Sequence, residues 1–247
     1  ASRQRTLSAL HEFAQRCQEE GVEQLSAVGT AAFRMAENGA EFVQQVRQET
    51  GIPLQIISGE EEAHTMASGV LSALEPHPEK ALIVDIGGGR TGLSVVKSTD
   101  DHQDSVERRG VISEQLKKVR NDLACACRGT GVDQENIVLV GTAGTVTTIA
   151  ALDLEMESYD WRRINNHQLS FSSIDQWYAT LTPMSAVERE TLVGMEAGRG
   201  DLILAGIEII QGLMLLLDLE VLTVSDFGIL EGLLLAQESS TVVRASR

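Results

Sequence analysis

The stretch that decides the fold is ALIVDIGGGRTGLSVV, residues 81–96, in which two apolar runs flank a glycine loop. The apolar runs have the composition of buried strands. Gly87, Gly89 and Gly92 match the spacing G-x-G-x-x-G, but a dinucleotide-binding loop leads into a helix, and a second strand-like run follows here. We therefore predict a hairpin turn whose glycines let backbone N–H groups approach an anion. Asp85, at the end of the first run, is a candidate Mg²⁺ ligand beside that anion, although a solvated aspartate at a tight turn is an equal alternative.

A second glycine loop, Gly141-Thr142-Ala143-Gly144-Thr145, separates an apolar strand at 137–140 from an apolar helix. The first turn of a helix presents unpaired N–H groups and the positive end of the helix dipole, which suits a phosphate. The alternative is an ordinary strand–helix turn capped by threonine. Two glycine loops that each follow an apolar strand favour a phosphate site, and the motif G-x-x-x-x-G-K-[ST] of P-loop nucleotidases does not occur.

Working outward, apolar strands alternate with amphipathic segments along the chain, which predicts an α/β fold. The clearest linker is Glu75-Pro76-His77-Pro78-Glu79, and it predicts an N-terminal unit at 1–75, a second unit at 80–238 and a frayed tail at 239–247. Helices are expected at 3–20, 41–50, 58–74, 113–128, 173–181, 186–193, 202–217 and 228–237. Strands are expected at 24–30, 54–57, 81–86, 93–96, 137–140, 167–171 and 219–224.

Two charged residues in the N-terminal unit are further candidates. Ser58-Gly59-Glu60-Glu61 has the spacing of a helix capping box, and this explains Glu61 without a catalytic role. Glu62 is not needed for capping, and its carboxylate could deprotonate a water molecule beside a phosphate. Arg34 closely follows a predicted strand, where a planar guanidinium could bind phosphate; an ordinary surface arginine is the alternative.

Composition limits the class of protein. The chain has 247 residues with 43% hydrophobic content and a formal charge of −16, typical of a globular protein and unfavourable for general nucleic-acid binding. Three cysteines form neither a disulfide framework nor a zinc site, which favours a reducing, cytoplasmic location. The most apolar stretch, 202–217, contains Glu208 and Gln211 and is shorter than a bilayer span, so we expect no membrane association.

The motifs occur in an order that resembles a known family. VGTAAFR (28–34), IISGEEEA (56–63), DIGGGRTG (85–92), GTAGT (141–145), RGDLILAG (199–206) and VSDFGILEG (224–232) together resemble the exopolyphosphatase / guanosine pentaphosphate phosphohydrolase family of the actin-like ATPase superfamily. The resemblance extends from about Arg3 to Leu235. It implies two RNase H-like lobes with phosphate bound between them, and Mg²⁺-dependent release of a terminal phosphate from polyphosphate or guanosine pentaphosphate.

The resemblance also assigns roles to residues of this chain. Glu62 matches the general base and Asp85 the metal-associated aspartate, so both are our predicted catalytic residues and metal ligands. Arg34 matches a phosphate-binding arginine. The remaining predicted substrate-binding residues are the two loops: Gly87, Gly88, Gly89, Arg90, Thr91, Gly141, Thr142, Ala143, Gly144 and Thr145. A homodimer is also compatible with the resemblance.

This sequence departs from the family pattern at several positions. The family begins with a strand and loop of the type D-x-G-T-N-S that this chain does not contain, so we expect its first lobe to be incomplete. Arg90 replaces the serine of D-I-G-G-G-S-T-E, Gly92 replaces its acidic residue, and Leu230 replaces an arginine. Two functions follow from these residues. One is a phosphatase in which Glu62 activates water; the other is a weakly active or inactive member that binds polyphosphate or guanosine alarmones as a sensor. A third, less favoured interpretation is an actin-like ATPase or sugar kinase, based on the DIGGG loop alone.

Overall fold

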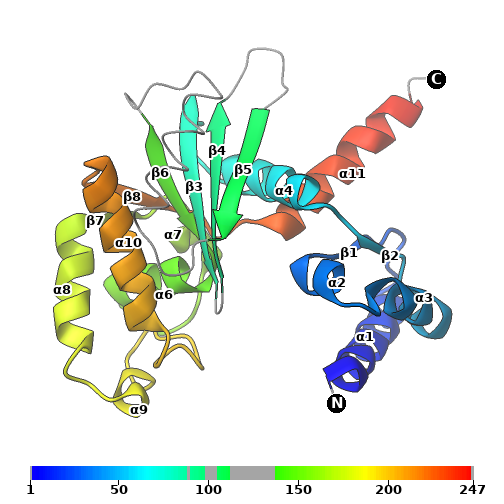
Figure 1. The fold of residues 1–247 in the computed structure, drawn as a ribbon, viewed down its shortest axis with the longest axis horizontal. Helices are drawn as coiled ribbons and strands as arrows, with labels where there is room; N and C mark the ends of the chain where they lie inside the picture. The colour runs from blue at the N-terminus through cyan, green and yellow to red at the C-terminus, as the bar shows by residue number, and fades with distance from the viewer. Residues whose placement is uncertain (1, 88–89, 98–104, 112–136, 246–247) are drawn as a thin grey trace. The chain divides into compact units, whose positions relative to one another are not determined.

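The computed structural model describes residues 2–87, 90–97, 105–111 and 137–245 (Figure 1). The chain divides into two compact units, Ala1–Glu62 and Ala63–Arg247. This division falls inside a helix, before the proline-containing linker, and the predicted lobe ranges 1–75 and 80–238 stay predictions. The predicted helix at 113–128 lies outside the described residues.

The first unit is built from α1 (Ser2–Glu19), β1 (Ala27–Gly29), α2 (Ala31–Met35), α3 (Gly39–Thr50) and β2 (Leu54–Ile56). Strands β1 and β2 pair in parallel, with Ala27 opposite Leu54. Helix α3 ends at Gly51, whose φ of 74° gives a left-handed cap that most other residues adopt only with strain. The apolar faces of α1, α3 and β2 form one small core of Leu7, Phe42, Val43, Val46, Ile52 and Leu54.

Helix α4 (Gly59–Ser72) begins in the first unit and leads into the second, which contains a six-stranded sheet in the order β5-β4-β3-β6-β8-β7. Its strands are β3 (Lys80–Gly87), β4 (Arg90–Lys97), β5 (Ser105–Val111), β6 (Val138–Thr142), β7 (Gln168–Ser170) and β8 (Val221–Val224). Strands β3 and β4 are antiparallel, with Gly87 opposite Arg90. This pairing confirms the predicted hairpin at the glycine loop and excludes a dinucleotide-binding loop there.

Alternate residues of β3 face opposite sides of this sheet, as the period of a strand requires. Leu82, Val84 and Ile86 belong to the main core, together with buried residues of α6 (Ala143–Asp153), α8 (Phe171–Leu181) and α10 (Ile203–Leu217). Ala81 and Ile83 belong instead to a smaller core with Ala67, Val70, Leu71 and Leu74. Helices therefore cover both faces of the sheet, and α8 and α10 lie side by side (Figure 1).

The C-terminal helix α11 (Ile229–Ala245) corrects one expectation. The tail predicted at 239–247 is helical as far as Ala245, because residues 238–245 contain neither glycine nor proline to end the helix. Three elements were not predicted: α2, β5 and α7 (Trp161–Ile164). Conversely, α9 (Ala186–Arg189) is shorter than the helix expected at 186–193.

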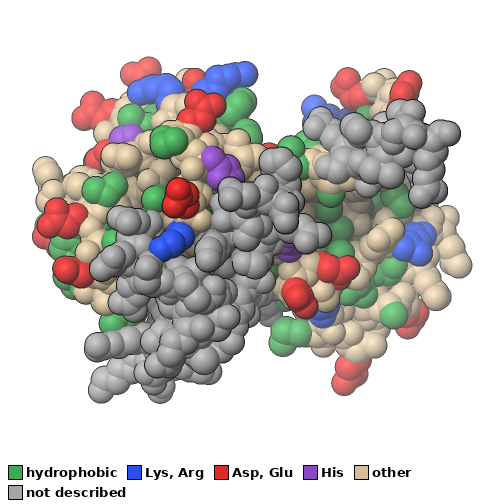
Figure 2. All heavy atoms as spheres, turned by 90° about the horizontal axis from the view of Figure 1, so that it is seen from above, with side chains coloured by type: hydrophobic (Ala, Val, Ile, Leu, Met, Phe, Trp, Pro, Cys, Tyr) green, Lys and Arg blue, Asp and Glu red, His purple; other side chains and the backbone are tan. Residues whose placement is uncertain are grey.

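In the described residues, no helix has both the length and the hydrophobicity required to cross a bilayer. The face drawn in Figure 2 carries acidic side chains scattered singly and in small groups, with fewer Lys and Arg side chains between them. A broad basic surface, as a nucleic-acid binder would need, is not seen on that face among the described residues.

Candidate functional site

The carboxyl ends of three parallel strands bring the predicted residues of the second unit to one edge of the sheet. On β3 and β6, Asp85 lies opposite Thr142, and Gly141 lies opposite Val224 on β8. Asp226 comes two residues after the end of β8. In open α/β sheets this edge is where ligands bind, because the loops and helix N-termini that follow the strands converge there.

The second glycine loop forms the start of α6, as predicted. Thr142 is the N-cap residue, but its hydroxyl donates to the carbonyl of Phe227 (3.1 Å) and makes no cap to the helix. Ala143 has a φ of 67°, an unusual conformation for a residue with a Cβ. The N-terminal turn of α6 thus lacks a capping side chain on Thr142, so its N–H groups are available to an acceptor such as a phosphate oxygen.

Arg199 lies against this turn, although it was not among the predicted site residues. A Cβ placed on Gly144 would come within 1.7 Å of Nη2 of Arg199, so the guanidinium occupies the space that a side chain would fill. Arg199 Nε donates to Glu196 (3.0 Å), and Thr148 on α6 contacts the same carboxylate oxygen (3.4 Å). A cation beside the positive end of a helix is unfavourable by itself. An anion bound between them would be attracted to both the guanidinium and the helix N-terminus.

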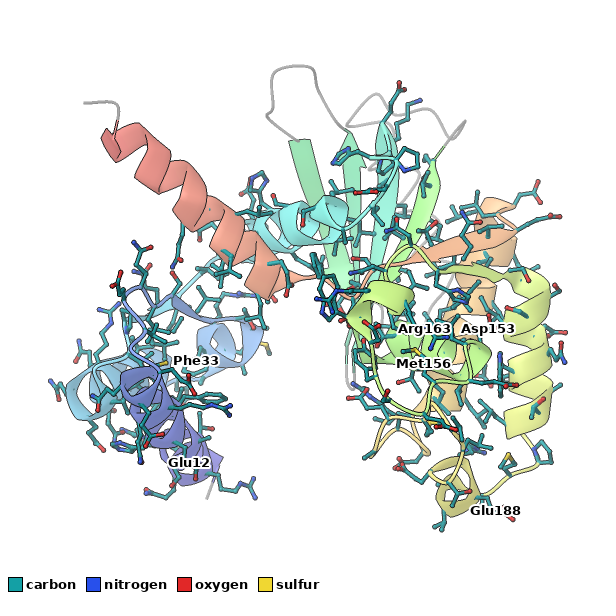
Figure 3. The ribbon with its side chains drawn as sticks, turned by 180° about the vertical axis from the view of Figure 1, so that it is seen from behind. Glu12, Phe33, Asp153, Met156, Arg163 and Glu188 are labelled. Carbon is teal, nitrogen blue, oxygen red and sulfur yellow. The ribbon has the colours of Figure 1, made fainter. Side chains whose placement is uncertain are left out.

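A cavity of about 860 Å³ adjoins the same turn. One wall is apolar, formed by Ala151, Met156, Leu192, Val193 and Met195. Met156 comes three residues after the end of α6, and its side chain is labelled in Figure 3. The polar lining includes Thr147, Thr148, Glu157, Tyr159, Glu196, Arg199 and Asp226. A cavity with an apolar wall next to an anion-binding turn has room for more than a phosphate chain.

Tyr159 and Asp226 form a hydrogen-bonded pair in this cavity. The Tyr159 hydroxyl donates to Oδ1 of Asp226 (2.5 Å), and Asn165 accepts from the backbone N–H of Asp226 (2.6 Å). Partial burial of the phenol, and then its hydrogen bond to Asp226, raise the pKa of Tyr159 well above the usual value. Tyr159 therefore stays protonated at neutral pH and acts as a donor, not as a base.

In the first unit, the structure brings together the two predicted residues Arg34 and Glu62. Arg34 Nη2 lies 2.7 Å from Oε2 of Glu62, and Nη1 donates to the carbonyl of Ile57 (2.9 Å). Both side chains are largely buried, at 25% and 20% exposure. The guanidinium is therefore oriented from two sides, and it fixes the direction of the Glu62 carboxylate.

The neighbouring acids of α4 have the structural role expected of them. Ser58 and Glu61 form both hydrogen bonds of the capping box, at 2.7 and 3.1 Å. The backbone N–H and the hydroxyl of Ser58 hold the pKa of Glu61 below its usual value. Glu62 lies one position further along the helix and pairs with Arg34, so the two adjacent acids have different partners.

The first glycine loop is described only in part. Gly87 ends β3, and the backbone of Arg90 and Thr91 begins β4, while Gly88 and Gly89 lie outside the described residues. Sequence reasoning missed Arg199, Glu196, Tyr159 and Asp226. Two of these lie in motifs that were noted for their order alone: Arg199 opens RGDLILAG and Asp226 lies in VSDFGILEG.

The oxygen donors at the sheet edge fit a magnesium ion. Within the described part of the chain, no three acidic, histidine or cysteine side chains gather into a site that could hold a metal unaided. Mg²⁺ does not require such a cage, because it usually keeps several waters and binds through one or two carboxylates plus substrate phosphates. Asp85, opposite Thr142 on the adjacent strand, could supply one such carboxylate.

Comparison with known proteins agrees with this geometry. A model described as the Ppx/GppA phosphatase family matches residues 1–241. Exopolyphosphatase 1 of Mycobacterium bovis is 26% identical over 257 residues, covering 95% of this chain and 73% of the relative. The protein of the same name from Mycobacterium tuberculosis gives the same values.

Solved structures confirm the predicted α/β, actin-like fold class. The Ppx/GppA family member of Aquifex aeolicus superposes with a TM-score of 0.75 at 27% identity, over 97% of this chain and 82% of that one. An exopolyphosphatase from Cytophaga hutchinsonii has a TM-score of 0.76 at 21% identity, over 96% of this chain and 82% of that one. The second match concerns the fold alone.

Proposed function

Because this chain belongs to the Ppx/GppA phosphatase family, we propose that it hydrolyses the terminal phosphoanhydride bond of polyphosphate. The observation that carries the proposal is the position of Arg199, whose guanidinium lies against the first turn of α6 at the sheet edge that holds Asp85. Backbone N–H groups and a guanidinium are complementary to phosphate oxygens. The relatives named exopolyphosphatase 1 support polyphosphate as the substrate class.

Glu62 is the proposed general base. Its carboxylate accepts a proton from water as the water oxygen attacks the terminal phosphorus, and the bridging P–O bond breaks to leave a chain shorter by one phosphate. The ion pair with Arg34 supports this role, because it holds the carboxylate in one direction. If an Arg34 nitrogen also contacts the phosphate, the guanidinium offsets negative charge on the phosphoryl group under attack.

Mg²⁺ is the proposed cofactor, with Asp85 as its protein ligand and Glu62 as a second candidate ligand. Such an ion would neutralise charge on the phosphate oxygens. The pairing of Asp85 with Thr142 on adjacent strands supports this assignment.

The deciding experiment measures phosphate release from polyphosphate with Mg²⁺ for the purified chain, Glu62→Gln and Arg34→Ala. We expect Glu62→Gln to lower kcat at least about 100-fold with little change in KM, as for loss of a general base. Glu61→Gln is the matched control, because it neutralises the adjacent capping carboxylate and should keep kcat within about twofold. Equal turnover by wild type and Glu62→Gln would exclude Glu62 as the base.

If the folded chain binds polyphosphate but releases no phosphate, the hydrolase proposal fails and the sensor function takes its place. The sensor alternative is motivated by the departures at Arg90 and Gly92, because Gly92 stands where the family pattern has an acidic residue. Equilibrium binding of polyphosphate, measured beside phosphate release, separates the two functions.

Guanosine pentaphosphate is a second candidate substrate, favoured by the apolar wall of the cavity beside α6. A nucleoside can bury its base against such a wall, whereas a polyphosphate chain gains nothing from it. Val193→Glu places a charge in that wall at a side chain that is 53% exposed, so it should raise KM for guanosine pentaphosphate and leave KM for polyphosphate unchanged. Equal effects on both substrates would argue against a nucleoside in this cavity.

A homodimer is our remaining proposal on assembly. It is supported by Leu230 and Leu234, which lie one turn apart on α11 with side chains that are mostly exposed. Light scattering of wild type and Leu230→Glu tests it. A monomeric wild type would exclude it.

A further inference from the structure

The loop that carries Arg199 is held by a carboxylate at the C-terminal end of the preceding helix. Glu190 follows α9 directly, and its two oxygens accept from the backbone N–H groups of Gly198 (3.0 Å) and Gly200 (2.8 Å). These glycines are the immediate neighbours of Arg199 on either side. One carboxylate thus fixes the backbone before and after the arginine.

A second side chain secures the same point from the other direction. Arg189 is buried, and it donates through Nη1 to the carbonyl of Gly200 (2.7 Å) and through Nε to the carbonyl of Leu181 (2.9 Å). Gly200 therefore has its N–H bound by Glu190 and its carbonyl bound by Arg189. Helix α9 is itself anchored at its start, where Ser185 and Glu188 form a capping box.

Both glycines are required by this arrangement. Gly198 has a φ of 81°, a conformation that other residues adopt only with strain. A Cβ on Gly200 would lie 2.4 Å from the carbonyl oxygen of Ala186. The loop consequently approaches α9 closely enough for the short contacts of Glu190, and the backbone on either side of Arg199 has little freedom to move.

We propose that Glu190 is a positioning residue for substrate binding, which acts by holding Arg199 against the first turn of α6. This inference rests on the proposed function, because it requires the turn to bind phosphate. Glu190 does not line the cavity and acts only through the backbone beside Arg199. The hydrogen bonds from Gly200 and Gly198 hold the pKa of Glu190 below its usual value, so the carboxylate is ionised at neutral pH.

The test is a double-mutant cycle on ligand binding. The probe is bismethylene triphosphate, whose P–C–P bridges cannot be hydrolysed, titrated calorimetrically in Mg²⁺ against wild type, Glu190→Ala, Arg199→Ala and the double variant. We expect Arg199→Ala to weaken binding at least about tenfold, as for loss of a charge-assisted contact. Glu190→Ala should weaken it about three- to tenfold, and the double variant should be no weaker than Arg199→Ala within about twofold.

Glu188→Ala is the matched control, because it removes another carboxylate at α9, which accepts from the backbone N–H of Ser185 (2.7 Å) and does not touch the loop. It should bind the probe like wild type. Equal weakening by Glu188→Ala and Glu190→Ala would overturn the inference, because the effect would then come from general loosening of α9. Glu190→Gln retains one acceptor oxygen and should be intermediate, and it serves in the cycle when Glu190→Ala does not fold.

The outcomes separate this inference from the proposed function. When Arg199→Ala weakens binding and Glu190→Ala weakens it by the same factor in both backgrounds, Glu190 is not acting through Arg199, and the inference alone fails. When Arg199→Ala binds like wild type, the phosphate site at α6 fails and the inference fails with it. Because the probe measures binding, neither result depends on turnover.

Discussion

At the scale of single residues, Gly144 is the most informative position in the site. Its missing Cβ leaves the space that the Arg199 guanidinium fills, at 1.7 Å from where a Cβ would lie. The obstructing atoms belong to the end of a flexible side chain, so a larger residue can be accommodated by moving Arg199. Stability and function should therefore respond differently to the same substitution.

We predict that Gly144→Ala changes the free energy of unfolding by no more than about 1 kcal/mol, since alanine favours helix and the arginine can move. Binding of a triphosphate should weaken about tenfold, because Arg199 is displaced from the turn. Urea unfolding and calorimetric titration of the same preparations measure the two effects. Unchanged affinity in a folded Gly144→Ala protein would show that the observed position of Arg199 does not matter for binding.

Tyr159 gives a prediction on pH. Its pKa is raised in the folded protein by partial burial and by Asp226, so the neutral form is favoured on folding. The stabilisation is fully present below the unfolded pKa of about 10 and is lost as pH rises through the folded value. The difference in unfolding free energy between wild type and Tyr159→Phe should be constant near neutrality and shrink above about pH 10. A difference that grows with alkaline pH would contradict the assigned direction.

At the scale of elements, the contact between α4 and α11 depends on two glycines. A Cβ on Gly69 would lie 1.9 Å from the carbonyl oxygen of Gly228, and one on Gly232 would lie 1.8 Å from that of Thr65. The obstructing atoms here are backbone, which cannot rotate away. The two helices can approach this closely only without side chains at these positions.

Gly69→Ala should therefore lower the free energy of unfolding by about 1–3 kcal/mol, the usual cost of overpacking. Gly228→Ala is the matched control at the same contact, because a Cβ there meets nothing within 4 Å. It should be nearly neutral in the same denaturant measurement. Similar losses for both variants would mean that the helices are not held at the observed distance.

Elements with a strong local signal in the sequence were predicted well, and elements without one were not. The β3–β4 hairpin was predicted because two apolar runs flank glycines, which favour a turn between them. Helix α7 has only four residues. Asp160 caps it, but the residues that follow show no apolar periodicity from which a helix could be predicted. Such segments become helical because their neighbours fix their ends, which local sequence does not encode.

At the scale of the whole molecule, the formal charge of −16 sets how a polyanion approaches. Binding is assigned to backbone N–H groups and a few arginines, within a surface that repels phosphate at long range. Raising monovalent salt from about 20 to about 150 mM, at constant Mg²⁺, should leave kcat/KM for polyphosphate unchanged or higher, because screening weakens this repulsion. A steep fall with salt, as seen for basic nucleic-acid binders, would mean that a cationic surface captures the substrate.

The sequence by itself determined the alternation of strands and helices, the two glycine loops, the capping box and the family, because each depends on residues close together in the chain. It also named Glu62 and Arg34, but only the tertiary structure paired them at 2.7 Å. Arg199 became part of the site only when a loop after α9 folded against α6. That contact joins residues 55 positions apart, and it depends on the hydrogen bonds of Glu190 and on the absence of a Cβ at Gly144, neither of which a local pattern reveals.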